Sequence, residues 1–270
     1  MAFSLKNLVK SALPHAVIEY SVRWHDYMRL GWPAAEASRK AFSVERYQAM
    51  CDARLNLLPR KILRSLRTCV DAGAHVGNWT LALLPFKPER VIALECEPRL
   101  VERLTTAMAT YPSVEVVVAA LAGGDGEATF YQLRHPAGSS LLKPQEGIAK
   151  EFEARSWDVI GETKVRKIGY DQLVVRESEV SVLKLDIQGA EREVLAGSVE
   201  GLQKTWSVIL EVNFTQHYES DAVFGELHEL MKSKGFGLYR LSPPYHRGGR
   251  VLYADAVYIK EEILGALASA

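Results

Sequence analysis

From residue 68 onward, short apolar runs alternate with amphipathic stretches along the chain. The apolar runs have the length of buried strands, and we predict strands at Thr68 to Ala72, Val91 to Glu95, Val114 to Val118, Val180 to Asp186, Ser207 to Val212, Phe236 to Leu241 and Tyr253 to Ile259. The stretches between them predict helices at Trp79 to Leu84, Pro98 to Thr110, Glu191 to Ala196 and Ala222 to Lys234. This alternation indicates an α/β domain over residues 67–270, with a mainly parallel seven-stranded sheet and helices on both faces.

Residues 1–66 have a different pattern, with helical spacing interrupted by prolines. We interpret them as an N-terminal helical extension whose helices are a candidate surface for a homo-oligomer. Aromatic residues in this region suit either a packed core or the wall of a substrate pocket: Tyr20, Trp24, Tyr27 and Trp32.

Residues 123–175 break the strand and helix rhythm. Short strands are expected at Ala128 to Leu133 and Val165 to Ile168, with a polar stretch between them. A long insertion in an α/β sheet either carries function or is a mobile loop. Loops at the carboxyl ends of the strands surround the ligand site, so Ser139 and Ser140 are candidates for substrate contact.

Composition narrows the class of protein. The chain has 270 residues, 48% of them hydrophobic, and its 33 basic and 33 acidic residues give a formal net charge of zero. This balance disfavours a nucleic-acid partner. Three cysteines without metal-ligand spacing, no secretory leader and no apolar run long enough to span a membrane predict a soluble protein of the reducing cytoplasm.

The first candidate site is the turn that follows the strand at Thr68 to Ala72. Glycines at 73 and 77 let the backbone approach a ligand, and the acid Glu95 ends the next strand, where a carboxylate suits the two hydroxyls of a ribose. The G-x-G-x-x-G of a dinucleotide site is absent, and an acid disfavours a pyrophosphate, so we favour S-adenosyl-L-methionine over NAD. The predicted cofactor-binding residues are Asp71, Gly73, His75, Gly77, Asn78 and Glu95.

The second candidate site follows the strand that begins at Val180. Asp186 ends this strand and Glu191 opens the next helix, positions that suit either chemistry or helix capping. We name Asp186, Glu191 and His217 as candidate catalytic residues, with Asp186 the first choice for general base and His217 the alternative. A divalent ion held by Asp186 and Glu211 is a further hypothesis that the sequence leaves open.

Three strings carry a resemblance to a known family: Val70 to Gly77, Lys184 to Leu195 and Ile209 to Glu211, with Leu94-Glu95 between the first two. Together they resemble the FkbM-type methyltransferases from about residue 68 to Lys260. The resemblance implies a class I, Rossmann-like fold that uses S-adenosyl-L-methionine and methylates a hydroxyl oxygen of a sugar, glycolipid or polyketide-type molecule. His75 stands where the family usually has asparagine, and Cys96 where it usually has proline.

Particular residues bear on other possible functions. The string from Ser242 to Tyr245 is similar to the S-P-P-Y of DNA amino-methyltransferases, but it lies too near the chain end for that role. We interpret residues 242–250 as a mobile loop over the substrate, with Tyr245, His246 and Arg247 as weak candidate contacts. The motifs of short-chain dehydrogenases and P-loop NTPases are absent, whereas a non-catalytic cofactor-binding module remains an alternative.

Overall fold

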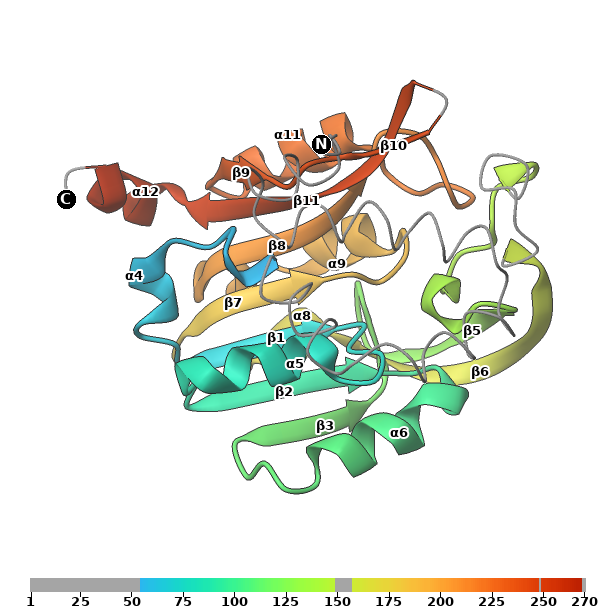
Figure 1. Cartoon of the computed structure of the whole chain (residues 1–270), viewed down its shortest axis with the longest axis horizontal. Helices are drawn as coiled ribbons and strands as arrows, with labels where there is room; N and C mark the ends of the chain where they lie inside the picture. The colour runs from blue at the N-terminus through green and yellow to red at the C-terminus, as the bar shows by residue number, and fades with distance from the viewer. Residues whose placement is uncertain (1–53, 149–156, 248, 269–270) are drawn as a thin grey trace, which may run out of the picture.

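The computed structural model describes residues 54–148, 157–247 and 249–268, and most of the expected N-terminal extension, with its four aromatic residues, lies outside this range. Within it, the larger sheet has eight strands in the order β10-β11-β8-β7-β1-β2-β3, with β9 paired to β11 (Figure 1). The strands are β1 Thr68–Ala72, β2 Arg90–Glu95, β3 Val114–Val118, β7 Val180–Leu185, β8 Thr205–Asn213, β9 Phe236–Leu241, β10 Tyr245–Arg247 and β11 Arg250–Lys260. The first five of these pair in parallel, which confirms the predicted doubly wound α/β class.

Alternate residues of each central strand face opposite sides of the sheet. One face carries Val70 and Ala72 of β1 into the largest buried cluster, which helices α9 (Glu191–Gly197) and α11 (Phe224–Ser233) cover. The other face carries Cys69 into a cluster completed by helix α5 (Asn78–Leu83) and by the segment around α4 (Arg60–Leu63). Residues 55–66 therefore belong to the core of the sheet, because five of their leucine and isoleucine side chains are buried in it.

The insertion forms a second sheet. Strands β4 (Ala120–Ala122), β5 (Gly126–Leu133) and β6 (Val159–Gly169) pair in the order β4-β6-β5, and β5 and β6 form a long antiparallel ribbon beside the main sheet (Figure 1). The two strands expected here are thus longer than the sequence predicted. Residues 126–133 and 159–169 are ordered by this pairing rather than being a mobile loop, because nearly every residue of β5 has a partner in β6.

The remaining elements are short or terminal. Helix α6 (Pro98–Met108) follows β2, and short helices α8 (Tyr170–Leu173) and α10 (Glu200–Gln203) flank β7. Helix α12 (Glu261–Ala268) follows β11, and the single-turn helices η1 (Leu84–Phe86) and η2 (Pro136–Gly138) complete the described chain. Residues 245–247, expected as part of a loop, pair with β11 as the eighth strand. Among the described helices, none has the length and apolar character needed to cross a bilayer.

Candidate active site

The turn after β1 lies against the end of β7. Gly73 has a φ of +72°, and a Cβ built on it would lie 2.0 Å from the backbone oxygen of Asp186. The backbone that Gly73 approaches closely is that of the turn after β7, and its approach to a ligand stays a prediction. Gly73 is needed because the two turns at the switch point of the sheet touch each other, and a side chain would force them apart.

Gly77 is needed for packing. Its φ is +88°, and a Cβ there would lie 2.6 Å from Cε of Met108 and 3.0 Å from Cδ1 of Leu104 on α6. Asn78 is half-buried as the first residue of α5. The glycine therefore lets the start of α5 approach α6, which places the turn beside the end of β2.

Asp71 is fully buried in β1. Its Oδ2 accepts a hydrogen bond from Thr80 Oγ1 at 2.7 Å, and its Oδ1 accepts one from Lys184 Nζ at 3.0 Å. A contact of Asp71 with the cofactor stays a prediction. Its carboxylate ties β1 to α5 and β7, since a buried charge requires a paired partner.

Glu95 faces the same turn from the end of β2. Its Oε2 accepts the backbone N–H of His75, and its Oε1 accepts those of Cys96 and Glu97, all at 2.8 Å. Burial raises the pKa of Glu95, partly offset by these hydrogen bonds. Because a carboxylate has about four acceptor sites, Glu95 keeps capacity for a ribose hydroxyl while it shapes the turn.

His75 adopts a φ of +56°, in the left-handed region of backbone conformation. Histidine and asparagine are both enriched in this region, so the replacement of asparagine by His75 preserves the turn. The geometry therefore fits an adenosyl group held between the turn at 73–77 and the Glu95 carboxylate, by the kind of acceptor that a ribose requires.

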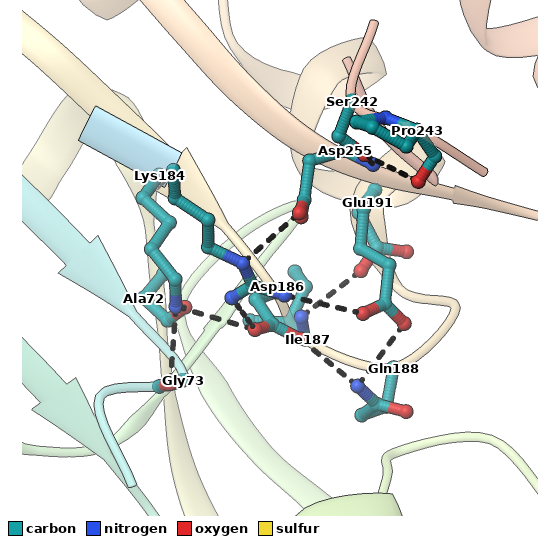
Figure 2. A network of polar contacts seen from close by, with 12 residues as sticks. Ala72, Gly73, Lys184, Asp186, Ile187, Gln188, Glu191, Ser242, Pro243 and Asp255 are labelled. Atoms are coloured by element: carbon teal, nitrogen blue, oxygen red, sulfur yellow. Dashed lines mark hydrogen bonds and ion pairs between the residues drawn. The ribbon is translucent and has the colours of Figure 1, made fainter. Parts of the chain in front are cut away.

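The end of β7 carries the second half of the site (Figure 2). Lys184 points toward the first turn, with Nζ 3.3 Å from the Gly73 carbonyl oxygen and 3.5 Å from Asp186 Oδ2. One buried ammonium thus binds Asp71 on one side and Asp186 on the other. The arrangement couples the two carboxylates that the sequence placed in separate motifs.

Arg54 and Asp255 complete the group of charged side chains around Asp186, and no sequence motif indicated a role for either of them. Arg54 Nη1 lies 2.8 Å from Asp186 Oδ2, its Nε lies 3.0 Å from Asp255 Oδ2, and its Nη2 lies 3.7 Å from a Glu211 oxygen. Burial opposes ionisation of Asp186, but the charges of Lys184 and Arg54 outweigh it and hold the pKa of Asp186 below its usual range. No local motif marks Arg54, because its three partners come from distant strands.

The Arg54 guanidinium also bears on the hypothesis of a bound divalent ion. Arg54 lies between Asp186 and Glu211, the two residues expected to hold a divalent ion. Across the described ranges, no set of three histidine, cysteine, aspartate or glutamate side chains is arranged to hold a metal ion. Burial, followed by the charge of Asp186, raises the pKa of Glu211 well above its usual value.

Glu191 shapes the second turn from the start of α9. Its two carboxylate oxygens accept the backbone N–H groups of Ile187 and Gly189, each at 2.9 Å, and burial raises its pKa to about 7. Gln188 adopts a φ of +58° inside this turn. Because both Glu191 oxygens bind the backbone, its geometry favours holding the turn over proton transfer.

His217 lies in an aromatic cluster at the same edge of the sheet. Its ring makes edge contacts with Trp157 and Tyr253, with centroids 6.0 and 6.3 Å away. Burial lowers the pKa of His217 to about 4, so its imidazole is neutral near pH 7. The neighbouring Tyr218 hydroxyl lies 2.8 Å from Gln188 Oε1, which links this cluster to the turn after β7.

The candidate substrate residues fall into two groups. Ser139 and Ser140 are buried, and their hydroxyls bind main-chain groups of the protein: Ser139 Oγ accepts the Leu133 N–H at 3.0 Å, and Ser140 Oγ donates to the Gln188 carbonyl at 2.6 Å. These hydrogen bonds hold the insertion in place, and direct substrate contact by the two serines stays a prediction. The other group, Tyr245, His246 and Arg247, lies on β10, and Tyr245 stacks on Tyr253 with centroids 5.1 Å apart.

The sheet order, the turn after β1 and the acid at the end of β2 together define a class I, Rossmann-like nucleotide-binding fold. Residues 71–238, more than half of the chain, match the model of the methyltransferase FkbM domain. The chain belongs to the FkbM methyltransferase family and is an S-adenosyl-L-methionine-dependent methyltransferase. Among curated proteins, no sequence matches it.

Several solved structures are similar in outline. A methyltransferase FkbM from Methylobacillus flagellatus KT is 15% identical with a TM-score of 0.47, and the match covers 73% of this chain and 44% of that one. Magnesium protoporphyrin IX methyltransferase from Synechocystis PCC 6803, with bound SAM, is 11% identical with a TM-score of 0.46 and coverage of 92% and 98%. Aeropyrum pernix fibrillarin, also with bound SAM, is 12% identical with a TM-score of 0.43 and coverage of 77% and 73%.

Proposed function

We propose that this methyltransferase transfers its methyl group to the oxygen of an uncharged hydroxyl, on a sugar, glycolipid or polyketide-type molecule. The supporting observation is the charge at the carboxyl ends of β7 and β8 and in the neighbouring part of β11. Three carboxylates, Asp186, Glu211 and Asp255, share the Arg54 guanidinium there. Asp186, whose pKa is held below its usual range, stays ionised there, so it would repel an anionic acceptor, whereas a hydroxyl can donate a hydrogen bond to it.

The chain's contribution to the reaction is positioning and proton acceptance. S-adenosyl-L-methionine supplies a methyl group on a positively charged sulfur, and the methyl passes in line to the acceptor oxygen as that oxygen loses its proton. Asp186 is the proposed acceptor of that proton, and its low pKa makes it an orienting hydrogen-bond acceptor until the hydroxyl becomes acidic in the transition state. His217, neutral near pH 7, is the alternative base.

The nucleic-acid alternative has less support from the geometry. Ser242 pairs with β11, because its N–H donates to the Asp255 carbonyl at 2.8 Å and its Oγ accepts the Asp255 N–H at 2.9 Å. One face of the Tyr245 ring is already covered by Tyr253, with the ring centroids 5.1 Å apart. The formal net charge of zero also disfavours a polyanionic acceptor.

A labelled-methyl assay tests the proposal. Purified protein is incubated with tritiated S-adenosyl-L-methionine and a panel of acceptors: neutral rhamnosides and fucosides, neutral glycolipids, macrolide aglycones, uronic acids and DNA. We expect label in a neutral hydroxyl compound as a base-stable methyl ether. Label in DNA or in a carboxylate ester would contradict O-methylation of a hydroxyl, and cofactor binding without any transfer would favour a binding module.

The catalytic assignment is tested with Asp186→Asn on the acceptor found in this way. Asparagine keeps the size and caps a helix about as well as aspartate, but it removes the charge. We expect S-adenosyl-L-methionine to bind less than about tenfold more weakly, because one neighbouring carboxylate is lost, while the methylation rate at saturating cofactor falls by roughly a hundredfold. Asp158→Asn, which removes a surface partner of Arg134, is the matched control. An unchanged rate in Asp186→Asn together with a large loss in His217→Ala would move the base to the histidine.

A further inference from the structure

Arg54 comes from outside the segment that matches the family model, yet it lies at the centre of the site. Its partners belong to three adjacent strands: Asp186 follows β7, Glu211 lies in β8 and Asp255 lies in β11. The Arg54 side chain is 24% exposed and that of Asp255 is 8% exposed. A planar group that binds several carboxylates at once holds their oxygens in fixed directions, which a flexible ammonium does less well.

Among the described residues, the carboxyl groups of Asp186, Glu211 and Asp255 converge on the Arg54 guanidinium. Lys184, which binds Asp71, also lies 3.5 Å from Asp186 Oδ2, and Glu191 lies nearby beneath the turn. Burial raises the pKa values of Glu211, Asp255 and Glu191, with Asp186 adding to the effect on each of them. The charge of Arg54 acts in the opposite direction and lowers the pKa values of Glu211 and Asp255.

The carboxylate cluster of Asp186, Glu211 and Asp255 lies beside the turn that is expected to hold the methyl donor. Asp186 directly follows the strand beside β1, and its carbonyl touches the turn at Gly73 that faces the Glu95 carboxylate. Because the turn at Gly73 and the end of β7 are in contact, a methyl donor held by that turn would have the carboxylate cluster as its neighbour across the switch point. A positively charged sulfur there is attracted by the carboxylates and repelled by Arg54.

We propose that Arg54 is a positioning residue with two effects on the methyl-transfer site. It holds the carboxyl groups of Asp186, Glu211 and Asp255 in fixed directions, and its positive charge offsets theirs, so that they do not over-stabilise the positively charged sulfur of S-adenosyl-L-methionine. The charge on sulfur disappears during transfer, so an unbalanced acidic cluster would bind the substrate state more strongly than the transition state. The inference rests on the methyl-transfer site described above. It also makes the chain N-terminal to the family domain part of that site.

The test compares two ligands that differ by this charge. S-adenosyl-L-methionine has a charged sulfur, and S-adenosylhomocysteine, its demethylated product, has a neutral one. We would measure both dissociation constants by calorimetry at pH 8 for the full chain and for Arg54→Gln, Arg54→Lys and Asp255→Asn. The informative quantity is the ratio of the two affinities, because a general loosening of the fold weakens both ligands alike.

Arg54→Gln should raise the preference for the charged ligand by roughly five- to twentyfold, as expected for removing one charge about 10 to 15 Å away at an effective dielectric of about 20. Arg54→Lys should keep the ratio within about threefold of wild type, since it retains the charge. Asp255→Asn should change the ratio in the opposite direction, by about threefold, since it removes an acid and leaves Arg54 in place.

Arg240→Gln is the matched control. Arg240 is exposed and its Nη1 binds the Asn56 carbonyl at 3.2 Å, so it contacts the same segment as Arg54 without touching the cluster. Its ratio should remain at the wild-type value. A folded Arg54→Gln with an unchanged ratio would overturn the proposal, as would equal losses of both ligands. If Arg54→Gln does not fold, Asp255→Asn decides: a lowered ratio supports the proposal and an unchanged one overturns it.

Failure of the proposed function would look different. The ratio is measured without an acceptor, so a protein that methylates no hydroxyl in the panel still reports the effect of Arg54 on the charged ligand. Conversely, transfer to a hydroxyl by Arg54→Gln at an unchanged ligand ratio would retain O-methylation and remove only the role of Arg54.

Discussion

The turns after β1 and after β7 use the same backbone solution on either side of the switch point. Each has a glycine at positive φ, +72° at Gly73 and +98° at Gly189, and a polar residue at positive φ, His75 or Gln188. In each, a buried glutamate accepts backbone N–H groups of the turn: Glu95 for the first and Glu191 for the second. A carboxylate is well suited to this task because it can accept several donors at once.

The two turns differ in their surroundings. Beside the first, the one acid in the strand is neutralised by a buried lysine. Beside the second, three carboxylates converge on a partly exposed arginine. Similar turns therefore suit different functions. The first, with its acid neutralised, suits holding a cofactor, and the second, with its acidic surroundings, suits accepting a proton beside a sulfur that loses its positive charge.

Gly73→Val should have the largest effect, because it separates the two turns. A Cβ at residue 73 would lie 2.0 Å from a backbone oxygen, and the residue would also be held at positive φ. We expect a loss of more than about 4 kcal/mol in the free energy of unfolding, measured by urea denaturation. Gly124→Val is the control, since nothing lies within 4 Å of its Cβ position and it should cost less than about 1 kcal/mol. Similar values for the two variants would contradict the contact between the turns.

Lys184→Met tests the charge that joins the turns. The side chains of Lys184 and Asp71 are 4% and 0% exposed, so the substitution leaves a buried carboxylate without its cation. We expect a loss of about 3 kcal/mol in the free energy of unfolding. The double variant with Asp71→Asn should recover more than half of it, because the uncompensated charge is then gone. A double variant no more stable than Lys184→Met would show that packing, not charge, dominates at this position.

Glu95→Gln addresses the first turn alone. It removes the charged acceptor proposed for the ribose, and we expect S-adenosyl-L-methionine to bind about 2 kcal/mol more weakly by calorimetric titration. Glu102→Gln makes the same chemical change on an exposed residue of α6 and should leave the affinity unchanged. Wild-type affinity in Glu95→Gln would remove the ribose assignment.

Ser140→Ala should have the smallest effect and should concern the second turn only. It deletes the hydrogen bond from the insertion to the Gln188 carbonyl and the one that Leu142 N–H donates to Ser140 Oγ. We expect a loss of about 1 kcal/mol in stability by thermal unfolding, with cofactor affinity unaltered. A change in cofactor affinity larger than the change in stability would indicate that the insertion reaches the first turn as well.

Much of the fold follows from local patterns. The seven expected strands and four expected helices all form, with ends that differ by a few residues, because apolar spacing depends on which faces are buried and that is similar in any doubly wound sheet. Strands β5 and β6 are longer than the sequence predicts, since the polar residues on an exposed ribbon give little periodic signal.

The site residues likewise divide into those that the sequence marks and those whose surroundings only the structure reveals. The turn residues, Glu95 and Asp186 are marked in the sequence, because the chemistry of each lies within a few residues of a strand end. The burial of Asp71 was not foreseen, because a polar residue in a strand has no sequence feature that distinguishes a ligand contact from an internal ion pair.

By itself, then, the sequence determined the sheet, the two turns and the class of cofactor, since these depend on contacts along one strand–turn–helix unit. Only the tertiary structure decided which oxygens are already engaged within the protein, why residue 73 must be glycine, and that Arg54 joins three strands. Those outcomes depend on groups separated by more than a hundred residues in the chain, such as Arg54 and Asp186. The physical reason is that hydrogen bonding and charge balance are set by which segments meet in space, and no local pattern records that.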